Sequence, residues 1–225
     1  MNSIALRWPR LQLMPRVKPE HKEERRAQIV VAARACFARL GFHRTTLQDV
    51  FAEANLSAGC VYNYFRSKED LVLAIAEGRH HDEQQVITQA SSGRDPIEGL
   101  RAIAQRFTDN YLKEQGRERR HIAIQTWAEA VQNRAILRAV VAGFEEPKTQ
   151  IAKLISRGQA LGKLSRAVDA EATARTIIAM FHGFILQKLW EPGFDPAAGF
   201  AVFEKFLDSL SVESDHKVAR KSRCD

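Results

Sequence analysis

Apolar side chains recur along the chain every three or four residues, which is the period of an amphipathic α-helix. Short polar, glycine-containing or proline-containing stretches interrupt this pattern, and the sequence has no strand-like alternation and no repeat of fixed period. The pattern therefore predicts an all-α protein. It predicts long helices over residues 21–40, 68–89, 118–132, 134–158, 170–190 and 196–210, and a further helix that begins at Pro96 and carries Tyr111. Pro147 predicts a kink or a split within residues 134–158.

Residues 46–68, TLQDVFAEANLSAGCVYNYFRSK, contain the signals for two short helices joined by a tight turn. Thr46 and Asp49 have the spacing of a capping box, which predicts that a helix begins directly after Thr46. Asn55 favours a left-handed cap where the chain must turn, and Ser57 can cap the next helix. These signals together predict a helix-turn-helix.

The second short helix has the composition expected of a helix that reads DNA. Its first turn carries small residues, and aromatic and amide side chains that can form hydrogen bonds follow. Such a helix fits a major groove about 12 Å wide, and its leading N–H groups can meet phosphate. Ser67 and Asp70 form a second capping box, from which a longer helix begins. The same pattern also fits an ordinary helical protein that contains two short helices and a polar turn.

Between residues 25 and 71 the order of motifs is more specific. A helix ends in LGFHRTT, and the segments DVFAEANLS and VYNYFRSKEDL follow it. This order resembles the N-terminal DNA-binding region of the tetracycline-repressor-like (TetR) family. The resemblance implies a DNA-binding transcriptional regulator, most often a repressor, on a double-stranded operator. It implies that the following residues face the operator: Arg44, Thr46, Gln48, Ser57, Ala58, Gly59, Cys60, Tyr62, Asn63, Tyr64 and Lys68.

The residues that face the operator have different expected roles. We expect Thr46, Tyr62 and Lys68 to contact the DNA backbone and so to position the protein. We expect Gln48, Cys60, Asn63 and Tyr64 to contact the edges of the bases. Two other residues depart from the family pattern, since Phe51 stands where alanine is common and Asn55 where glycine is common. We expect the first departure to alter how the two short helices cross and the second to be nearly harmless.

Charge is unevenly distributed along the chain. There are 34 Lys and Arg against 27 Asp and Glu, a net charge of +7, and residues 1–70 hold 12 of the basic and 7 of the acidic side chains. A positive field over the predicted DNA-binding region suits phosphate. Cys36, Cys60 and Cys224 lack the spacing of a disulfide framework or a zinc site, so no metal or cofactor is expected. We expect Cys36 in the core, while the position of Cys60 in the reading helix leaves a redox role open.

Four segments are expected along the chain: a basic arm over residues 1–21, a DNA-binding domain over 22–70, a helical effector-binding and dimerisation domain over 71–211, and a basic tail over 212–225. Arginines and prolines interrupt the arm, so we expect neither a signal peptide nor a membrane span, and a cytoplasmic protein. The arm either stays disordered or adds contacts to DNA. Met14 is an alternative to Met1 as the first residue.

Residues 172–190, ATARTIIAMFHGFILQKLW, are apolar on nearly all sides. A helix of this kind must be covered on several faces. One face can pack on its own domain and another on a second copy of the protein, with residues 199–210 beside it, and the family resemblance also implies such a homodimer. A central core helix in a monomer is the alternative. The dimer would meet half-sites of a near-palindrome about 34 Å apart, or a multiple of that spacing.

The resemblance also implies a pocket for a small-molecule effector among the middle helices of the second domain. Candidate lining residues are Phe107, Tyr111, Gln125, Trp127, Glu129, Met180, Phe181 and His182. Side chains of these kinds at helical spacing also simply fill cores. As a set they describe an apolar cavity with few polar groups, which favours a hydrophobic or aromatic effector over a sugar or a nucleotide. We expect the effector to shift the helix that starts at Lys68 and so to change the separation of the two reading heads.

Two other classes of protein remain as alternatives. A small helical enzyme would need a catalytic constellation, and the sequence has no phosphate-binding loop, nucleophile elbow or H-E-x-x-H motif. His80 and His81 with Asp82 and Glu83 come nearest to a metal cluster, yet adjacent residues point about 100° apart on a helix. A non-specific DNA-packaging protein would need widely spread basic charge and no large apolar domain. We therefore predict a regulator without enzyme activity.

Overall fold

The computed structural model describes residues 19–91, 93–191 and 193–212, except for the side chains of residues 19, 20, 79–83, 85, 86, 90 and 91. Within these residues the chain is helical and has no β-strand, which confirms the all-α prediction. A π-helical turn (Thr108–Leu112) and a 3-10 turn (Glu114–Gly116) separate α5 from α6. The α-helices are α1 (Pro19–Leu40), α2 (Leu47–Ala54), α3 (Ala58–Tyr62), α4 (Lys68–Ser91), α5 (Pro96–Phe107), α6 (Arg117–Gln132), α7 (Arg134–Ala160), α8 (Ala170–Trp190) and α9 (Pro196–Ser209).

The helices agree with the sequence prediction apart from small differences at their ends and one larger difference. The helix that begins at Pro96 was expected to include Tyr111, but α5 ends at Phe107 and Tyr111 lies in the π-turn. Pro147 does not split α7, which continues from Arg134 to Ala160. A proline inside a helix leaves the carbonyl four residues earlier without its N–H partner, and that carbonyl belongs to Gly143.

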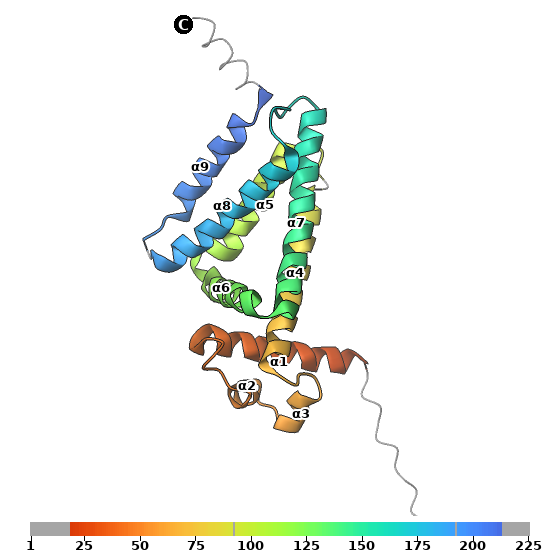
Figure 1. Ribbon diagram of the computed structural model, residues 1–225, viewed down its shortest axis with the longest axis vertical. Coiled ribbons are helices and arrows are strands. Elements are labelled where there is room, and N and C mark those ends of the chain that lie inside the picture. The colour runs from red at the N-terminus through yellow and green to blue at the C-terminus, as the bar shows by residue number, and fades with distance from the viewer. Residues whose placement is uncertain (1–18, 92, 192, 213–225) are drawn as a thin grey trace, which may run out of the picture.

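A head made of α1, α2, α3 and the first turns of α4 forms one end of the molecule. Figure 1 shows α1 lying across α2 and α3, and α4 leading from the head into the body. The inward faces of these helices are fully buried at Ile29, Cys36, Val50 and Val61. The expectation that Cys36 is a core residue is therefore confirmed, and the core fixes the angle at which α3 is presented.

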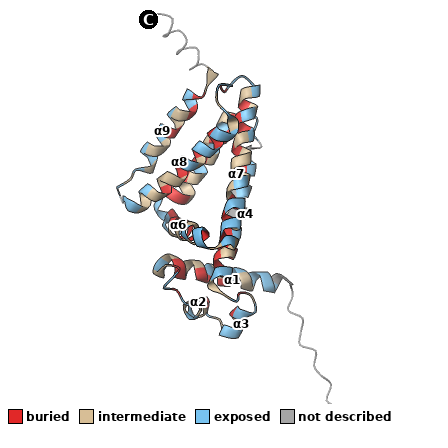
Figure 2. Cartoon of the chain, in the orientation of Figure 1, coloured by how far each residue is buried: buried red, intermediate tan, exposed pale blue. Residues whose placement is uncertain are grey.

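The body contains the remaining helices, with α9 lying along α8 (Figure 1). Its core is built by side chains such as Ile155 of α7, Ile177 of α8 and Phe203 of α9, each no more than 2% exposed. In Figure 2, buried residues alternate with exposed ones along the helices of the body, as expected when one face of each helix packs on a core. Burial of apolar surface between α5, α7, α8 and α9 therefore stabilises the body.

The head and the body share one apolar core. Ile122 of α6 and Ile136 of α7 belong to the same buried cluster as Phe37 of α1 and Val72 of α4. Helix α6 lies directly against α1, as Figure 1 shows. Helices α4, α6 and α7 of the body therefore pack directly against the head.

Several sequence predictions lie outside the described residues. These are residues 1–18 of the basic arm, residues 213–225 of the tail with Cys224, and the side chains of His80, His81, Asp82 and Glu83. Among the residues that are described, no helix is long and apolar enough to cross a membrane. No group of three or more described metal-ligating side chains is gathered closely enough to hold a metal ion.

Candidate DNA-binding head and effector cavity

The capping box at the start of α2 forms as predicted. The Thr46 hydroxyl accepts a hydrogen bond from the backbone nitrogen of Asp49 at 3.2 Å, and Asp49 Oδ2 accepts one from the backbone nitrogen of Thr46 at 2.7 Å. These bonds to Thr46 hold the pKa of the Asp49 carboxyl below its usual value. At the other end of α2, Asn55 has φ 52° and ψ 47°, the left-handed cap that the sequence predicts.

The reading helix α3 is anchored from its inner side. Ser57 caps it by accepting from the backbone nitrogen of Cys60 at 3.3 Å, while Val61 and Phe65 are buried. The ring of Phe51, the first departure from the family pattern, meets the ring of Tyr62 edge to face at 5.4 Å. Phe51 therefore lies at the contact between α2 and α3 and supports one side of Tyr62.

The residues expected to face an operator lie on the outer surface of the head. Cys60, Tyr64 and Lys68 are half-buried, and the remaining eight are exposed. Figure 2 shows this exposed surface on α2 and α3, at the end of the molecule away from the body. The exposed residues are Arg44, Thr46, Gln48, Ser57, Ala58, Gly59, Tyr62 and Asn63.

Lys68, for which a phosphate contact is expected, also has a role inside the chain. Its ammonium group donates to the carbonyl oxygens of Phe42 at 3.0 Å and His43 at 3.2 Å, and lies 4.8 Å from the centre of the Phe42 ring. The first residue of α4 thus holds the loop that leads into the helix-turn-helix. One of its three N–H donors is left for a phosphate.

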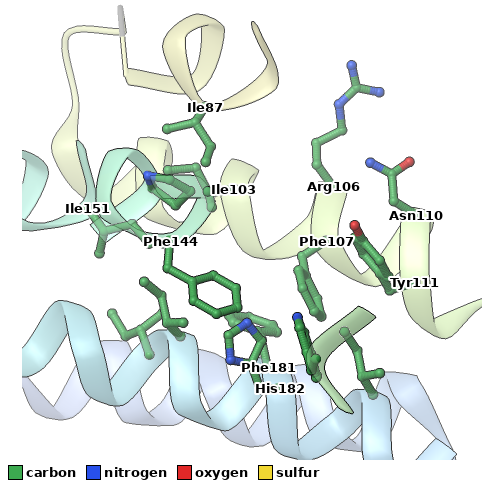
Figure 3. Close-up of a pocket in the computed structure, with 16 residues that line it drawn as sticks. Ile87, Ile103, Arg106, Phe107, Asn110, Tyr111, Phe144, Ile151, Phe181 and His182 are labelled. Atoms are coloured by element: carbon green, nitrogen blue, oxygen red, sulfur yellow. The ribbon is translucent and has the colours of Figure 1, made fainter. Parts of the chain in front are cut away.

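A cavity of about 90 Å³ lies in the body, with its aromatic side chains drawn together in Figure 3. A cavity of this size is smaller than the roughly 150 Å³ void that holds a benzene molecule. A larger molecule can enter only if side chains move. The lining residues are Ile87, Ile103, Arg106, Phe107, Asn110, Tyr111, Trp127, Gly143, Phe144, Pro147, Ile151, Ile177, Ile178, Phe181, His182 and Ile185.

Five of the residues expected at an effector pocket lie together in the wall of this cavity. Phe107 stacks on Tyr111 with ring centres 4.9 Å apart and contacts Phe181 at 4.7 Å. Trp127 and His182 contact each other at 4.7 Å. Helices α5, α6 and α8 and the π-turn therefore contribute side chains to one aromatic wall.

The other three expected residues do not line the cavity. Gln125 and Glu129 lie on the face of α6 that meets the head, because positions two residues away from Trp127 point to a different side of the helix. Met180 packs instead against the body core that contains Ile155 and Phe203. Helical spacing identifies which residues are apolar, but it does not show which neighbour each face of α6 meets.

Several residues that line the cavity were not predicted from the sequence. Many of them stand one helical turn from a residue that was identified, as Ile103 does from Phe107 and Ile177 and Ile185 do from Phe181. Extending each candidate by four residues along its helix would have found these. Phe144 and Pro147 have no such sequence signal, because they come from α7, where no candidate was identified.

The π-turn beside the cavity is held by a buried arginine of α6. Arg120 is 4% exposed, and its Nη1 donates to the carbonyl oxygens of Tyr111 and Lys113. Burial lowers the pKa of the Arg120 guanidinium. The backbone of Gly116 also packs closely against the π-turn, and only glycine fits there, since a Cβ would lie 2.6 Å from the carbonyl oxygen of Asn110. The cavity wall is thus fixed to α6.

Three side chains of α6 make polar contacts with the head. Gln125 bonds to the end of α1, Glu129 Oε1 lies 3.2 Å from Nε2 of His43, and Glu118 Oε1 lies 3.1 Å from Nη2 of Arg34. Together with the bonds from Lys68, these contacts hold the segment between α1 and α2 from both α4 and α6. The cavity and the head are therefore joined by two helices.

Comparison with known proteins agrees with this arrangement. Residues 29–75 match the family described as bacterial regulatory proteins, tetR family, and residues 96–212 match the C-terminal part of BetI-type transcriptional repressors. The HTH-type transcriptional regulator TtgR of Pseudomonas putida is 27% identical over 203 residues, which cover 87% of this chain and 94% of TtgR. The uncharacterized HTH-type transcriptional regulator YfiR of Bacillus subtilis is 38% identical over 103 residues, 41% of this chain and 50% of YfiR.

Solved structures give the same result. SmeT, the repressor of the Stenotrophomonas maltophilia multidrug efflux pump SmeDEF, superposes with a TM-score of 0.67 and 26% identity over 83% of this chain and 89% of SmeT. The complex of SmeT with triclosan superposes with a TM-score of 0.72 and 25% identity over 84% of this chain and 92% of that chain. Since one family match covers the head and another covers more than half of the chain through the body, the protein belongs to the tetR family of bacterial regulatory proteins.

Proposed function

We propose that the protein is a homodimeric repressor that binds a near-palindromic operator and is released from it by a small hydrophobic effector. The observation that carries this proposal is the double connection, through α4 and α6, between an exposed reading helix and an aromatic cavity. The family match is to transcriptional regulators and not to enzymes, which agrees with a reading helix and a ligand cavity in one chain. A protein that acts on DNA in a bacterium works in the cytoplasm, which completes the proposal.

Operator binding is assigned to the exposed face of α2, α3 and the turns beside them. Gln48 and Asn63 are exposed amides that can pair with base edges, and Tyr62 and the free donor of Lys68 can meet phosphates. The small residues at the start of α3 allow its backbone N–H groups to approach the DNA closely. The phosphate contacts would fix the position of the head along the DNA, and the base contacts would give it a preference for one sequence.

Dimerisation is assigned to α8 and α9. Ala179, Gly183, Leu186 and Trp190 follow one another along α8 at spacings of four, three and four residues, and Trp190 is 69% exposed. Val202 on the adjacent α9 is 61% exposed. Small and apolar side chains on neighbouring helices form a surface suited to a second copy of the same surface, as a twofold axis requires.

The effector site is assigned to the aromatic cavity. The structural relative SmeT has been solved in complex with triclosan, so a regulator of this fold accepts a small organic molecule. An effector larger than the 90 Å³ cavity must displace wall residues on α6, α7 or α8 to enter. Because α6 and α4 also hold the head, the enlarged cavity favours a different head position.

The energy that this mechanism needs is modest. An effector that binds the DNA-incompetent arrangement about 100-fold more tightly than the other arrangement contributes about 2.7 kcal/mol to the shift. Operator binding then weakens by at most a similar factor. A ligand that binds tightly and leaves operator affinity unchanged contradicts this part of the proposal.

The test is footprinting of the purified full-length protein on the DNA that flanks its own coding region, at physiological salt and with competitor DNA. We expect protection of a near-palindrome whose half-sites are about 34 Å apart or a multiple of that distance. Protection spread over all sequences, with a steep salt dependence for every DNA, would instead support non-specific binding. An alanine variant at Asn63 should lose the specific protection and retain the non-specific binding.

A further inference from the structure

Three polar side chains of the aromatic cavity lie along one edge of it, while His182 and Trp127 stand together elsewhere in its wall. Arg106, Asn110 and Tyr111 follow one another at the end of α5 and in the π-turn. Figure 3 shows Arg106 and Asn110 extending to the same side and the Tyr111 hydroxyl pointing toward them, while the rings of Phe144 and Phe181 lie on the other side. Arg106 is exposed, so this edge is where the cavity meets solvent. The shape fits a molecule with an apolar body and one polar end.

The charge at this edge is positive. Arg106 has no ion-pair partner among the described residues, and none of the described residues that line the cavity is an acid. The carboxylate of Asp109, three residues along the chain, interacts with Arg106 through charge alone, since its close contacts are with the ammonium of Lys113 at 2.6 Å and with Gln105, which donates to it at 3.0 Å. The guanidinium of Arg106 is therefore available to a ligand.

A second guanidinium lies behind the same wall. Arg120 is 4% exposed, its Nε has no hydrogen-bond partner, and no described carboxylate lies within 4 Å of it. Glu114 and Arg117 are the other charged groups that act on it, and their effects oppose each other. A buried charge without a counter-ion destabilises a protein unless something offsets it. Its field reaches the π-turn, because Arg120 donates to the carbonyl oxygen of Tyr111.

The wall also holds a hydrogen-bond donor without an acceptor. Trp127 Nε1 is buried and has no partner among the described residues. The ring contacts His182 at 4.7 Å and Phe144 at 6.1 Å, and all three residues line the cavity. A buried N–H without an acceptor is costly, and its positive end adds to the potential that disfavours a cation in this cavity.

We propose that the effector is a flat aromatic molecule with one anionic oxygen group, a carboxylate or a phenolate, and that Arg106 selects it at the cavity edge. This inference rests on the proposed effector site. The aromatic rings bury the body of the ligand, and Arg106 with Asn110 binds the anionic group. Arg106 is the specificity-determining residue, because a guanidinium binds a carboxylate through two parallel hydrogen bonds.

The opposite class of ligand would be an aromatic or quaternary cation. Clusters of aromatic rings attract cations through their faces, so the rings alone do not decide between the two classes. Two guanidinium groups at one wall raise the local potential and disfavour a cation there. The charge of the preferred ligand therefore separates the two classes by experiment.

The test compares three probes that share one ring system: 2-naphthoate, 2-naphthamide and 2-naphthyltrimethylammonium. Their dissociation constants for the full-length protein are measured by isothermal titration calorimetry at pH 7 and low salt. We expect 2-naphthoate to bind at least about tenfold more tightly than the amide, and the ammonium probe to bind most weakly. Equal affinities, the tightest binding by the ammonium probe, or no binding by 2-naphthoate overturns the inference.

Two variants assign the preference to Arg106. Arg106→Gln should weaken 2-naphthoate about tenfold and leave the amide unchanged, while Arg138→Gln, which removes an exposed arginine of α7 outside the cavity lining, should change neither. Unchanged thermal melting and circular dichroism confirm that both variants fold. If 2-naphthoate retains its full advantage in Arg106→Gln, Arg106 is not the selecting residue and the inference is wrong.

Failure of this inference can be told apart from failure of the proposed function. Operator protection without any probe depends only on the head and the dimer. A protein that protects its operator but does not prefer 2-naphthoate remains a regulator with a different ligand class. A protein that prefers 2-naphthoate but protects no specific DNA contradicts the proposed function and leaves the ligand class standing.

Discussion

Gln125 of α6 accepts a hydrogen bond from the backbone nitrogen of Phe42 at 2.8 Å, so a body helix closes the loop that leads into the DNA-binding head. Its amide nitrogen also donates to the carbonyl oxygen of Phe37 at 3.1 Å, at the end of α1. Phe42 is 7% exposed. Without Gln125, its N–H would be buried with no partner from α6.

Replacing Gln125 by alanine should therefore lower the free energy of unfolding by about 1–3 kcal/mol, the cost of leaving a buried polar group unsatisfied. Urea denaturation monitored by circular dichroism measures the change. Gln132→Ala, at an exposed position of the same helix, is the matched control and should alter stability by less than about 0.5 kcal/mol. Equal effects of the two substitutions would mean that the bonds to α1 contribute little.

Asp49→Asn should change how stability depends on pH. Bonds to Thr46 lower the pKa of Asp49 below 3.8 in the folded protein, so the carboxylate contributes stability that is present above about pH 4 and is lost as pH falls through the lowered pKa. The variant should be less stable than the wild type at pH 7, and the two should converge in acid. Melting temperatures across this pH range, with the exposed Glu77→Gln as control, test the prediction.

Gly116→Ala should destabilise the π-turn. Its Cβ would lie 2.6 Å from the carbonyl oxygen of Asn110 and 2.8 Å from the carbonyl carbon of Tyr111, and backbone atoms cannot move aside without displacing the cavity wall. Overpacking of this kind costs about 1–3 kcal/mol. Gly78→Ala in α4, where an added Cβ meets nothing within 4 Å, should instead stabilise by up to about 1 kcal/mol. The two melting temperatures should shift in opposite directions.

Gln48→Ala should reduce sequence-specific binding by the head. Loss of an amide that pairs with a base edge costs about 1–3 kcal/mol, or roughly 5- to 150-fold in affinity for the operator. Affinity for unrelated DNA, measured by fluorescence anisotropy at the same salt, should stay unchanged. Gln84→Ala, an exposed glutamine of α4 in the body, should leave both affinities unaltered. A parallel fall in both affinities would assign Gln48 to phosphate positioning.

Trp190→Ser should dissociate the proposed dimer. Trp190 is 69% exposed at the end of α8, where it can bury its ring only against another molecule. Light scattering after size exclusion should show a monomer at concentrations where the wild type is a dimer, and operator affinity should fall at least about tenfold. Val131→Ser removes an apolar side chain that is 84% exposed on α6 and should preserve the dimer. A variant that remains a dimer would move the interface away from this end of α8.

The local features of the head follow from the sequence, and features that depend on packing between distant helices do not. The capping residues Thr46 and Ser57 act on backbone groups three residues away, so short motifs suffice to identify them. The bonds of Lys68 to Phe42 and His43 span 26 and 25 residues and have no local signal.

The cavity shows the same limit. Its aromatic character follows from Phe107, Tyr111 and Phe181, which recur at helical spacing. The side of α6 that faces the cavity depends on how α1 packs against α6, and this is why Gln125 and Glu129 were placed with Trp127. The π-turn could not be predicted from local sequence either, because Arg120, which donates to its carbonyl oxygens, stands nine positions beyond Tyr111.

The shared apolar core of head and body has a consequence for engineering. A head transplanted onto the body of a relative would have to meet an α6 and an α7 that present side chains equivalent to Ile122 and Ile136. Modular exchange of operator and effector specificities should therefore succeed when these contact positions are exchanged together with residues 19–75. A chimera joined only at the chain boundary should fold poorly, because the boundary runs through a packed interior rather than a linker.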